Sequence, residues 1–106
     1  SMVSNLAPNP FTSQTWMSLN VPHPVPTAPG GGGTVDETTR TEVQIEIFDV
    51  LGRRVSQLYH DGVVDDVLTI SWDGTDDGGR ILPSGVYFVK VQVAGFKEVR
   101  KVMLLR

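Results

Sequence analysis

The 106-residue chain contains no cysteine, only two histidines and no long apolar run. Without cysteine it can form no disulfide and offers no thiolate nucleophile or cysteine-ligated zinc site. No segment approaches the roughly 18 apolar residues that a membrane-spanning helix needs, and no signal peptide is evident. The net charge of −3 disfavours nucleic acid or an anionic membrane as the main partner.

The few residues suited to catalysis stand in poor places for it. His23 lies among prolines and His60 lies in a predicted turn, whereas a histidine general base needs a rigid partner and a pocket. The paired carboxylates Asp65-Asp66 and Asp76-Asp77 are typical of turns, because aspartate side chains accept hydrogen bonds from nearby backbone N–H groups. We therefore expect no enzymatic activity and no cofactor.

Length and composition fit one globular domain over residues 3–106, with 40% hydrophobic residues. Ser1-Met2 resembles a cloning scar, which suggests a domain taken from a longer protein. Residues 22–41 hold four prolines and the run Gly30 to Gly33. Because this stretch has little to bury, we expect a flexible, exposed loop that tolerates shortening.

Apolar residues recur with the period of two that β-strands impose, and turn residues separate the runs. This pattern predicts an all-β domain, a seven-stranded antiparallel immunoglobulin-like β-sandwich. In the last strand the apolar residues do not keep one period, which predicts a bulge or burial on both faces. The expected core residues are Met17, Leu19, Ile45, Ile47, Ile70, Trp72, Tyr87, Val89 and Val91. The expected strands are Val3–Leu6, Thr15–Val21, Val43–Ile47, Arg53–Tyr59, Val67–Trp72, Gly85–Val93 and Phe96–Leu105.

Charge is distributed unevenly along the sequence. Six aspartates and no basic residue lie between Asp61 and Gly79. From Lys90 onward the sequence has five basic residues and one acidic residue, Glu98. One interpretation is a solvated acidic loop beside a basic hairpin at the sheet edge. The other is that the basic edge docks on an acidic partner.

The glycine-rich stretch after Trp72 allows two interpretations. The carboxylates of Asp73, Asp76 and Asp77 could wrap a calcium ion, although the spacing and closing glutamate of the helical calcium loop are absent. Alternatively, Asp73-Gly74 and Asp77-Gly78 each form a turn. We expect the turns and no metal, with calcium as the alternative.

Aromatic residues provide a different possible function. Exposed, coplanar Trp16 and Phe48 would favour stacking on a polysaccharide, and packing under loops is the alternative. The residues concerned are Trp16, Phe48, Tyr59, Trp72, Tyr87 and Phe88.

Three blocks occur in a specific order: Pro8-Asn9-Pro10, Gly85-Val86-Tyr87, and a terminal run of Lys101, apolar residues and Arg106. With the strands between them, they resemble the C-terminal sorting domain of type IX secretion cargo in Bacteroidetes-like bacteria. They also resemble the related immunoglobulin-like domain of the flagellar hook-capping protein. The resemblance covers nearly the whole chain. The loop at residues 22–41 is longer than the family's short turn.

The resemblance implies a non-catalytic role at the end of a secreted hydrolase, protease or adhesin. Such domains are exported through the periplasm, guide passage across the outer membrane, and accompany attachment to the cell surface or release. The implied partners are a secretion-machinery receptor, an outer-membrane translocon and an upstream catalytic or adhesive domain. The alternatives are an accessory carbohydrate-binding or adhesion module and a structural spacer domain.

The terminal strand is the predicted recognition segment, because an unpaired strand edge offers main-chain hydrogen bonds to a partner. The predicted contact residues are Lys101, Val102, Met103, Leu104, Leu105 and Arg106. The predicted supporting residues are Pro8, Asn9, Pro10, Gly85, Val86 and Tyr87.

Overall fold

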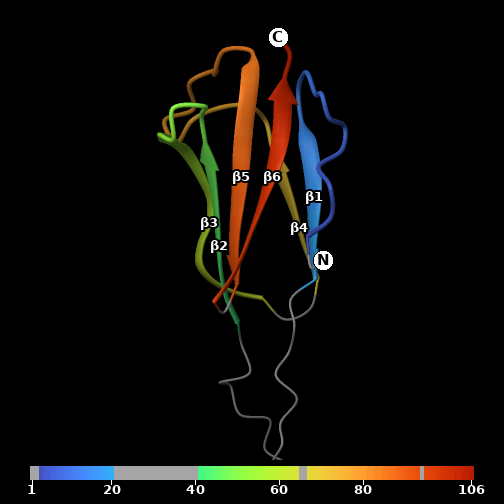
Figure 1. Ribbon diagram of the computed structural model, residues 1–106, viewed down its shortest axis with the longest axis vertical. Helices are drawn as coiled ribbons and strands as arrows, with labels where there is room; N and C mark the ends of the chain where they lie inside the picture. Colours follow the sequence, from blue (N-terminus) through green and yellow to red (C-terminus); the bar gives the residue numbers. More distant parts are fainter. Residues whose placement is uncertain (1–2, 21–40, 65–66, 94) are drawn as a thin grey trace, which may run out of the picture.

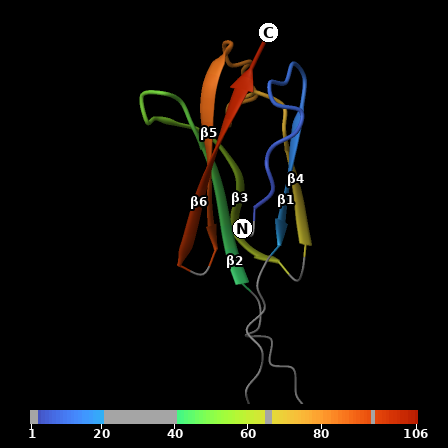
Figure 2. The same cartoon turned by 45° about the vertical axis from the view of Figure 1, so that its right-hand side comes forward.

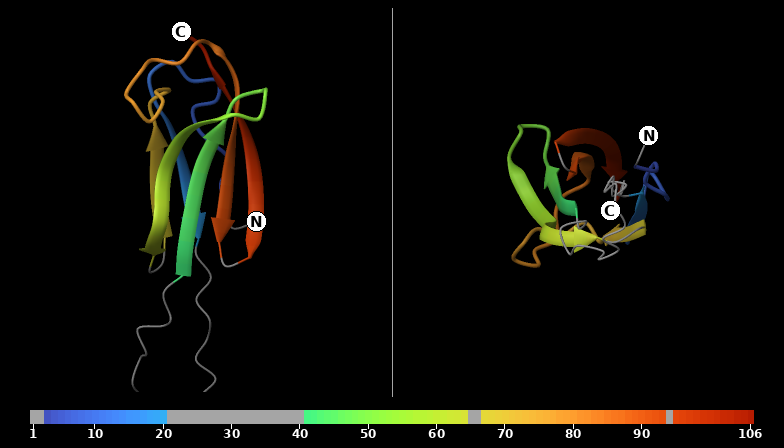
Figure 3. Two further views of the ribbon diagram at one scale, coloured as in Figure 1. Left: turned by 90° about the vertical axis from the view of Figure 1, so that its left-hand side faces the viewer. Right: turned by 90° about the horizontal axis from the view of Figure 1, so that it is seen from below.

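The computed structural model describes residues 3–20, 41–64, 67–93 and 95–106. Within these ranges the chain forms two antiparallel sheets and no helix. The described residues therefore contain no helix that could cross a membrane. The sheets face each other as a sandwich (Figures 1 and 3), which confirms the predicted all-β architecture. The two-stranded sheet has the order β1-β4, and the four-stranded sheet has the order β3-β2-β5-β6. The strands are β1 (Thr15–Asn20), β2 (Thr41–Phe48), β3 (Arg54–Val64), β4 (Val67–Trp72), β5 (Gly85–Val93) and β6 (Phe96–Leu104).

The described residues contain six strands rather than the predicted seven. The first predicted strand, Val3–Leu6, is not a strand, because this region pairs with β1 only through isolated bridges from Val3 and Ala7. Pro8 follows at once. A proline has no N–H and fixes φ, so the pairing cannot continue as a regular ladder.

The core lies between the two sheets and follows the alternation of the strands. Every predicted core residue is buried except Ile70, which is half-buried and packs against the core. Ile70 lies on β4 of the small sheet, where the residues from Val67 to Ile70 alternate between exposed and half-buried and only Trp72, at the end of the strand, is buried. The core also contains residues outside the predicted set, namely Val3, Leu6, Phe11, Val43, Val93, Val102 and Leu104.

The predicted turn at His60-Asp61-Gly62 is wrong, because β3 continues through it to Val64 and pairs with the start of β2. The register between β2 and β3 shifts at three places. Such irregularities let a strand absorb extra residues without leaving the sheet. Gly62 therefore lies inside a long, irregular strand.

The irregularity expected in the last strand is absent. β6 pairs with β5 residue for residue, without a shift, from Phe96 to Leu104. Val102 and Leu104 point inward, whereas Val99 and Met103 are exposed. Burial therefore follows the ordinary period of two, and the prediction of a bulge or two-sided burial is wrong.

Several sequence-based predictions lie outside the described residues. They concern Ser1-Met2, His23, Asp65-Asp66 and the loop at residues 22–41, of which only Thr41 is described. Thr41 belongs to β2 rather than to a loop.

Residues 3–11, here called the N-terminal strap, run along β1 and then reach the end of β6 (Figures 1 and 2). On the β1 side, the Ser4 N–H donates to Ser18 O at 2.8 Å, and the Ser18 N–H donates to Ser4 Oγ at 2.8 Å. Ala7 and Trp16 exchange both main-chain hydrogen bonds, at 3.0 and 2.8 Å. The strap thus covers the edge of β1.

On the β6 side, the side-chain amide of Asn9 makes the two hydrogen bonds that a peptide group of a neighbouring strand would make. Its Nδ2 donates to Lys101 O, and its Oδ1 accepts from the Met103 N–H, both at 3.0 Å. Phe11 continues this pairing, because its N–H donates to Met103 O at 3.0 Å and its carbonyl accepts from the Leu105 N–H at 2.9 Å. The Phe11 ring is 1% exposed and lies 5.5 Å from the Trp72 ring. The strap therefore joins the edges of the two sheets.

We expect Asn9→Ala to lower the free energy of unfolding by about 1–2 kcal/mol, because it leaves two strand groups without their partner. Urea unfolding measures this loss. Asn5→Ala is the matched control, since no described hydrogen bond involves the Asn5 side chain. Equal losses in the two variants would contradict the role given to Asn9.

Candidate recognition surface

The predicted recognition segment, residues 101–106, is divided between the core and the surface. Val102 and Leu104 are 0% exposed and belong to the core. A partner cannot contact them in the folded domain. The residues that remain exposed on this segment and point away from the core are Lys101, Met103 and Leu105.

Arg106 holds the segment in place. Its N–H donates to Ser84 Oγ at 2.7 Å, and its guanidinium donates to Leu82 O at 3.1 Å and to Gly74 O at 2.7 Å. These bonds tie the end of β6 to the loop between β4 and β5. Arg106 therefore has an anchoring role that the sequence did not reveal.

The prediction of an unpaired edge is wrong over Lys101 to Leu105, because Asn9 and Phe11 occupy the outward main-chain groups there. A partner strand could add at this place only by displacing the strap. The Pro8-Asn9-Pro10 motif, predicted to support the segment, covers its edge. What stays accessible is the face of the sheet.

An apolar cluster lies on the outer face of the four-stranded sheet beside the exposed terminal residues. In the strand register, Phe88 stands opposite Lys101 on one side and Phe48 on the other, and Val86 stands opposite Met103. The Lys90 Nζ lies 5.6 Å from the centroid of the Phe48 ring, a favourable cation–π distance. We call Phe48, Val86, Phe88 and Met103 the outer-face cluster.

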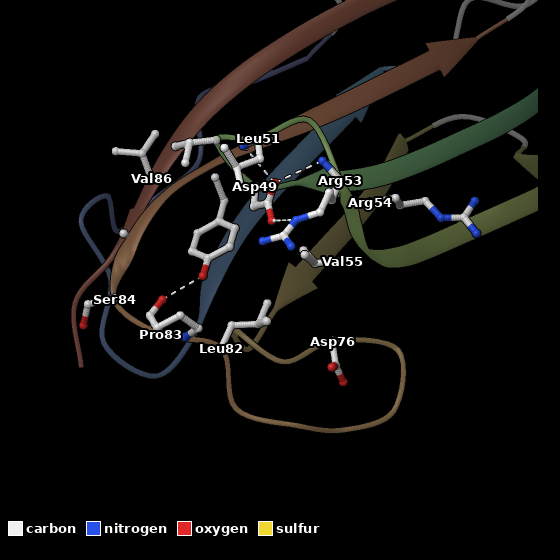
Figure 4. A pocket seen from close by; sticks show the side chains of 13 residues that line it. Asp49, Leu51, Arg53, Arg54, Val55, Asp76, Leu82, Pro83, Ser84 and Val86 are labelled. Carbon is white, nitrogen blue, oxygen red and sulfur yellow. Dashed lines mark hydrogen bonds and ion pairs between the residues drawn. The ribbon is translucent and has the colours of Figure 1, made fainter.

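A cavity of about 600 Å³ opens at the end of the sheet next to this cluster. Figure 4 shows Leu51 and Val86 on one side of it and Leu82 and Pro83 below. Gly85, Val86 and Tyr87 all line this cavity. The motif therefore forms its wall, in addition to supporting the terminal strand.

Tyr87 forms part of the core as well as of the cavity wall. Its ring is buried 5.2 Å from that of Trp72, and its hydroxyl donates to Pro83 O at 2.7 Å. Burial, together with the nearby Asp49 carboxylate, raises the pKa of the Tyr87 hydroxyl. The hydroxyl therefore keeps its proton at neutral pH and remains a donor.

Two hairpin turns near the cavity share one construction that sequence reasoning missed. In each, an aspartate Oδ1 accepts backbone N–H bonds from the second and fourth following residues, and a glycine with φ near 80° lies three residues after it. The signal was present as the repeated pattern Asp-x-x-Gly-Arg. The two copies are Asp49 to Arg53 and Asp76 to Arg80.

The other two proposed calcium ligands also serve local structure. Asp73 Oδ1 accepts from the Thr75 N–H at 3.1 Å and from Thr75 Oγ1 at 2.6 Å. Asp77 covers the edge of β3, since its N–H donates to Val55 O and its Oδ1 accepts from the Gln57 N–H. Over the described ranges, no three acidic or histidine side chains gather where they could hold a metal ion.

The aromatic residues do not form one stacking face. Trp16 is 49% exposed on the outer side of the two-stranded sheet, whereas Phe48 and Phe88 lie on the outer side of the other sheet. The core separates them, so the coplanar arrangement needed for the polysaccharide alternative is absent. Trp72 is buried, and the Tyr59 side chain lies outside the described part.

The profile of the FlgD Ig-like domain matches residues 25–95, more than half of the chain. The chain belongs to the FlgD Ig-like domain family. This membership agrees with the immunoglobulin-like sandwich predicted from the strand pattern. No curated protein matches the sequence.

Two solved structures from Porphyromonas gingivalis resemble this FlgD Ig-like domain. PorZ, described as an essential bacterial surface component of the type IX secretion system, has 17% identity and a TM-score of 0.61 over 98% of this chain and 11% of that chain. Dimeric latent PorU has 22% identity and a TM-score of 0.64 over 94% of this chain and 9% of that chain. The domain thus spans about a tenth of either protein, and the likeness shows a shared fold.

We expect Gly74→Ala to destabilise this FlgD Ig-like domain more than Gly52→Ala does. Both glycines have φ near 80°, where an added Cβ costs about 1–2 kcal/mol. Only at Gly74 would the Cβ also meet the Arg106 guanidinium at 2.7 Å; at Gly52 nothing lies within 4 Å. Comparing the thermal or urea unfolding of the two variants isolates the cost of the close contact at Gly74. Equal losses of stability in the two variants would contradict the prediction.

We also expect stability to fall in acid. Hydrogen bonds from the Arg53 backbone lower the pKa of Asp49, and the bond from the Thr75 hydroxyl lowers that of Asp73. Stabilisation from a lowered pKa is present above the unfolded value of about 3.9 and is lost as pH falls through the folded value. The urea concentration at the midpoint of unfolding should decline as the pH falls from about 5 to 2. It should decline less steeply in the double variant that carries both Asp49→Asn and Asp73→Asn. An unchanged decline would contradict this account.

Proposed function

We propose that this domain is the non-catalytic sorting signal of a secreted bacterial protein, recognised for type IX secretion and cell-surface attachment. The single observation that carries the proposal is the row of Lys101, Met103 and Leu105, held outward by a closed edge. These residues belong to the terminal run that resembles the sorting family. Membership of the FlgD Ig-like domain family and the fold shared with PorZ support it.

Under this proposal the receptor contacts side chains on a sheet face and does not add a strand. The strap covers the outward main-chain groups of Lys101, Met103 and Leu105, and Arg106 fixes the end of the segment, so the exposed row is held in place before the receptor arrives. Preorganised surfaces lose less conformational entropy on binding. The domain would then act as a compact marker that accompanies an upstream catalytic or adhesive domain to the outer-membrane translocon.

Residues 1–106 fused to an exported reporter, in a bacterium with the type IX machinery, test the proposal. The wild-type fusion should reach the cell surface. The fusion that carries both Lys101→Glu and Met103→Ser should stay in the periplasm. Truncation of residues 101–106 is unsuitable, because it removes Val102 and Leu104 from the core.

The double variant Lys97→Glu and Gln92→Ser is the matched control. It changes two residues that stand opposite each other on the same face, at its polar end and away from the outer-face cluster, and should leave secretion unchanged. Circular dichroism and urea unfolding establish that both variants are folded. Retention of the wild-type fusion in the periplasm, or normal surface delivery of the folded Lys101/Met103 variant, would refute the proposal.

A further inference from the structure

The described side chains on the outer face of the four-stranded sheet carry an excess of positive charge, although the chain as a whole is negatively charged. Among the described residues on this face, Arg54, Lys90, Lys97 and Lys101 are basic, and Glu42 and Glu46 are acidic. These four basic and two acidic residues give the described part of the face a net charge of +2, whereas the net charge of the entire chain is −3. Arg54 and Glu46 form an ion pair at 3.1 Å, so the excess charge lies on the lysines.

Apolar groups on the same face gather at one end. The outer-face cluster connects through the strand register from Phe48 across β5 to Met103, and the 74% exposed Leu51 continues it at the cavity rim. At the other end the face is polar, with Gln44 opposite Gln92. The apolar end, with Lys90 and Lys101 beside it, is therefore the part suited to desolvation by a partner.

We infer that this end of the outer face docks an acidic protein segment whose apolar side chains lie on the outer-face cluster and enter the cavity beside it. The inference rests on the proposed function, because it describes the chemistry of the sorting receptor. Carboxylates of the segment would approach Lys90 and Lys101. A leucine or aromatic side chain would cover the Phe48–Phe88 pair and reach the cavity at Leu51 and Val86.

Charge complementarity favours an acidic protein over other polyanions. Nucleic acid and anionic lipid attract extended basic patches, whereas this face has only three lysines outside its ion pair and belongs to an acidic domain. Apolar contacts at the centre of an interface supply most of the affinity. Charges at its rim set orientation and association rate and weaken with salt. The cluster and the lysines match these two roles.

Amide NMR titration of the isotope-labelled domain, residues 1–106, tests the surface directly. The probe is an eight-residue peptide that alternates glutamate with leucine and phenylalanine, and its control replaces each glutamate by lysine. The acidic peptide should shift amides of residues 48–54, 84–90 and 99–105, and Lys101→Gln should weaken its binding about threefold or more. Lys97→Gln, at the polar end, should change it little.

Equal binding of the lysine peptide, or shifts centred on Trp16 and the two-stranded sheet, would overturn the inference. Stronger binding to phosphatidylglycerol vesicles than to the acidic peptide would also overturn it. The reporter fusion separates this result from the proposed function. If the wild-type domain sorts the reporter while folded Leu51→Ser and Lys90→Gln also sort it, the docking surface is wrong and the function stands. If the wild-type domain does not sort the reporter, the function fails, and the peptide titration still decides the surface.

Discussion

The pairing of the N-terminal strap with the end of β6 is the contact on which the rest of the fold depends. The two sheets share no strand and pack through the core between them, and Asn9 and Phe11 add a hydrogen-bonded connection at their edges while Phe11 also fills the core. Side chains close sheet edges at three places, through Ser4 on β1, Asn9 on β6 and Asp77 on β3. Each protects main-chain groups that would otherwise pair with another chain.

Edge closure also determines which part of the terminal segment a partner can contact. Val102 and Leu104 stabilise the sandwich, and Arg106 anchors the loop before β5. The alternate residues that face outward are the ones left exposed to a partner. Under the proposed function, one short run of sequence would serve stability and binding on opposite faces of a single strand, so a change in either set of residues would have a distinct consequence.

Strand alternation was sufficient to predict the sandwich and most of its core, because Tyr87, Val89 and Val91 keep one period and lie on one face. It failed for β6, where Val99 and Met103 are apolar yet exposed, so residue type did not reveal burial. It also failed at His60 to Gly62, where turn-forming residues lie within a long strand. The role of Asn9 could not be predicted, since its partners lie 92 and 94 residues away.

That separation has a consequence for how the domain is made. Contacts between residues far apart in sequence form late, because a long loop must close before they are gained. During synthesis the strap emerges before its partners on β6. Until Lys101 and Met103 have emerged, Asn9 has no partner and the sheet has an open side. The contact between Asn9 and β6 therefore couples the finished surface to complete translation of this region, so that a prematurely terminated chain would lack it.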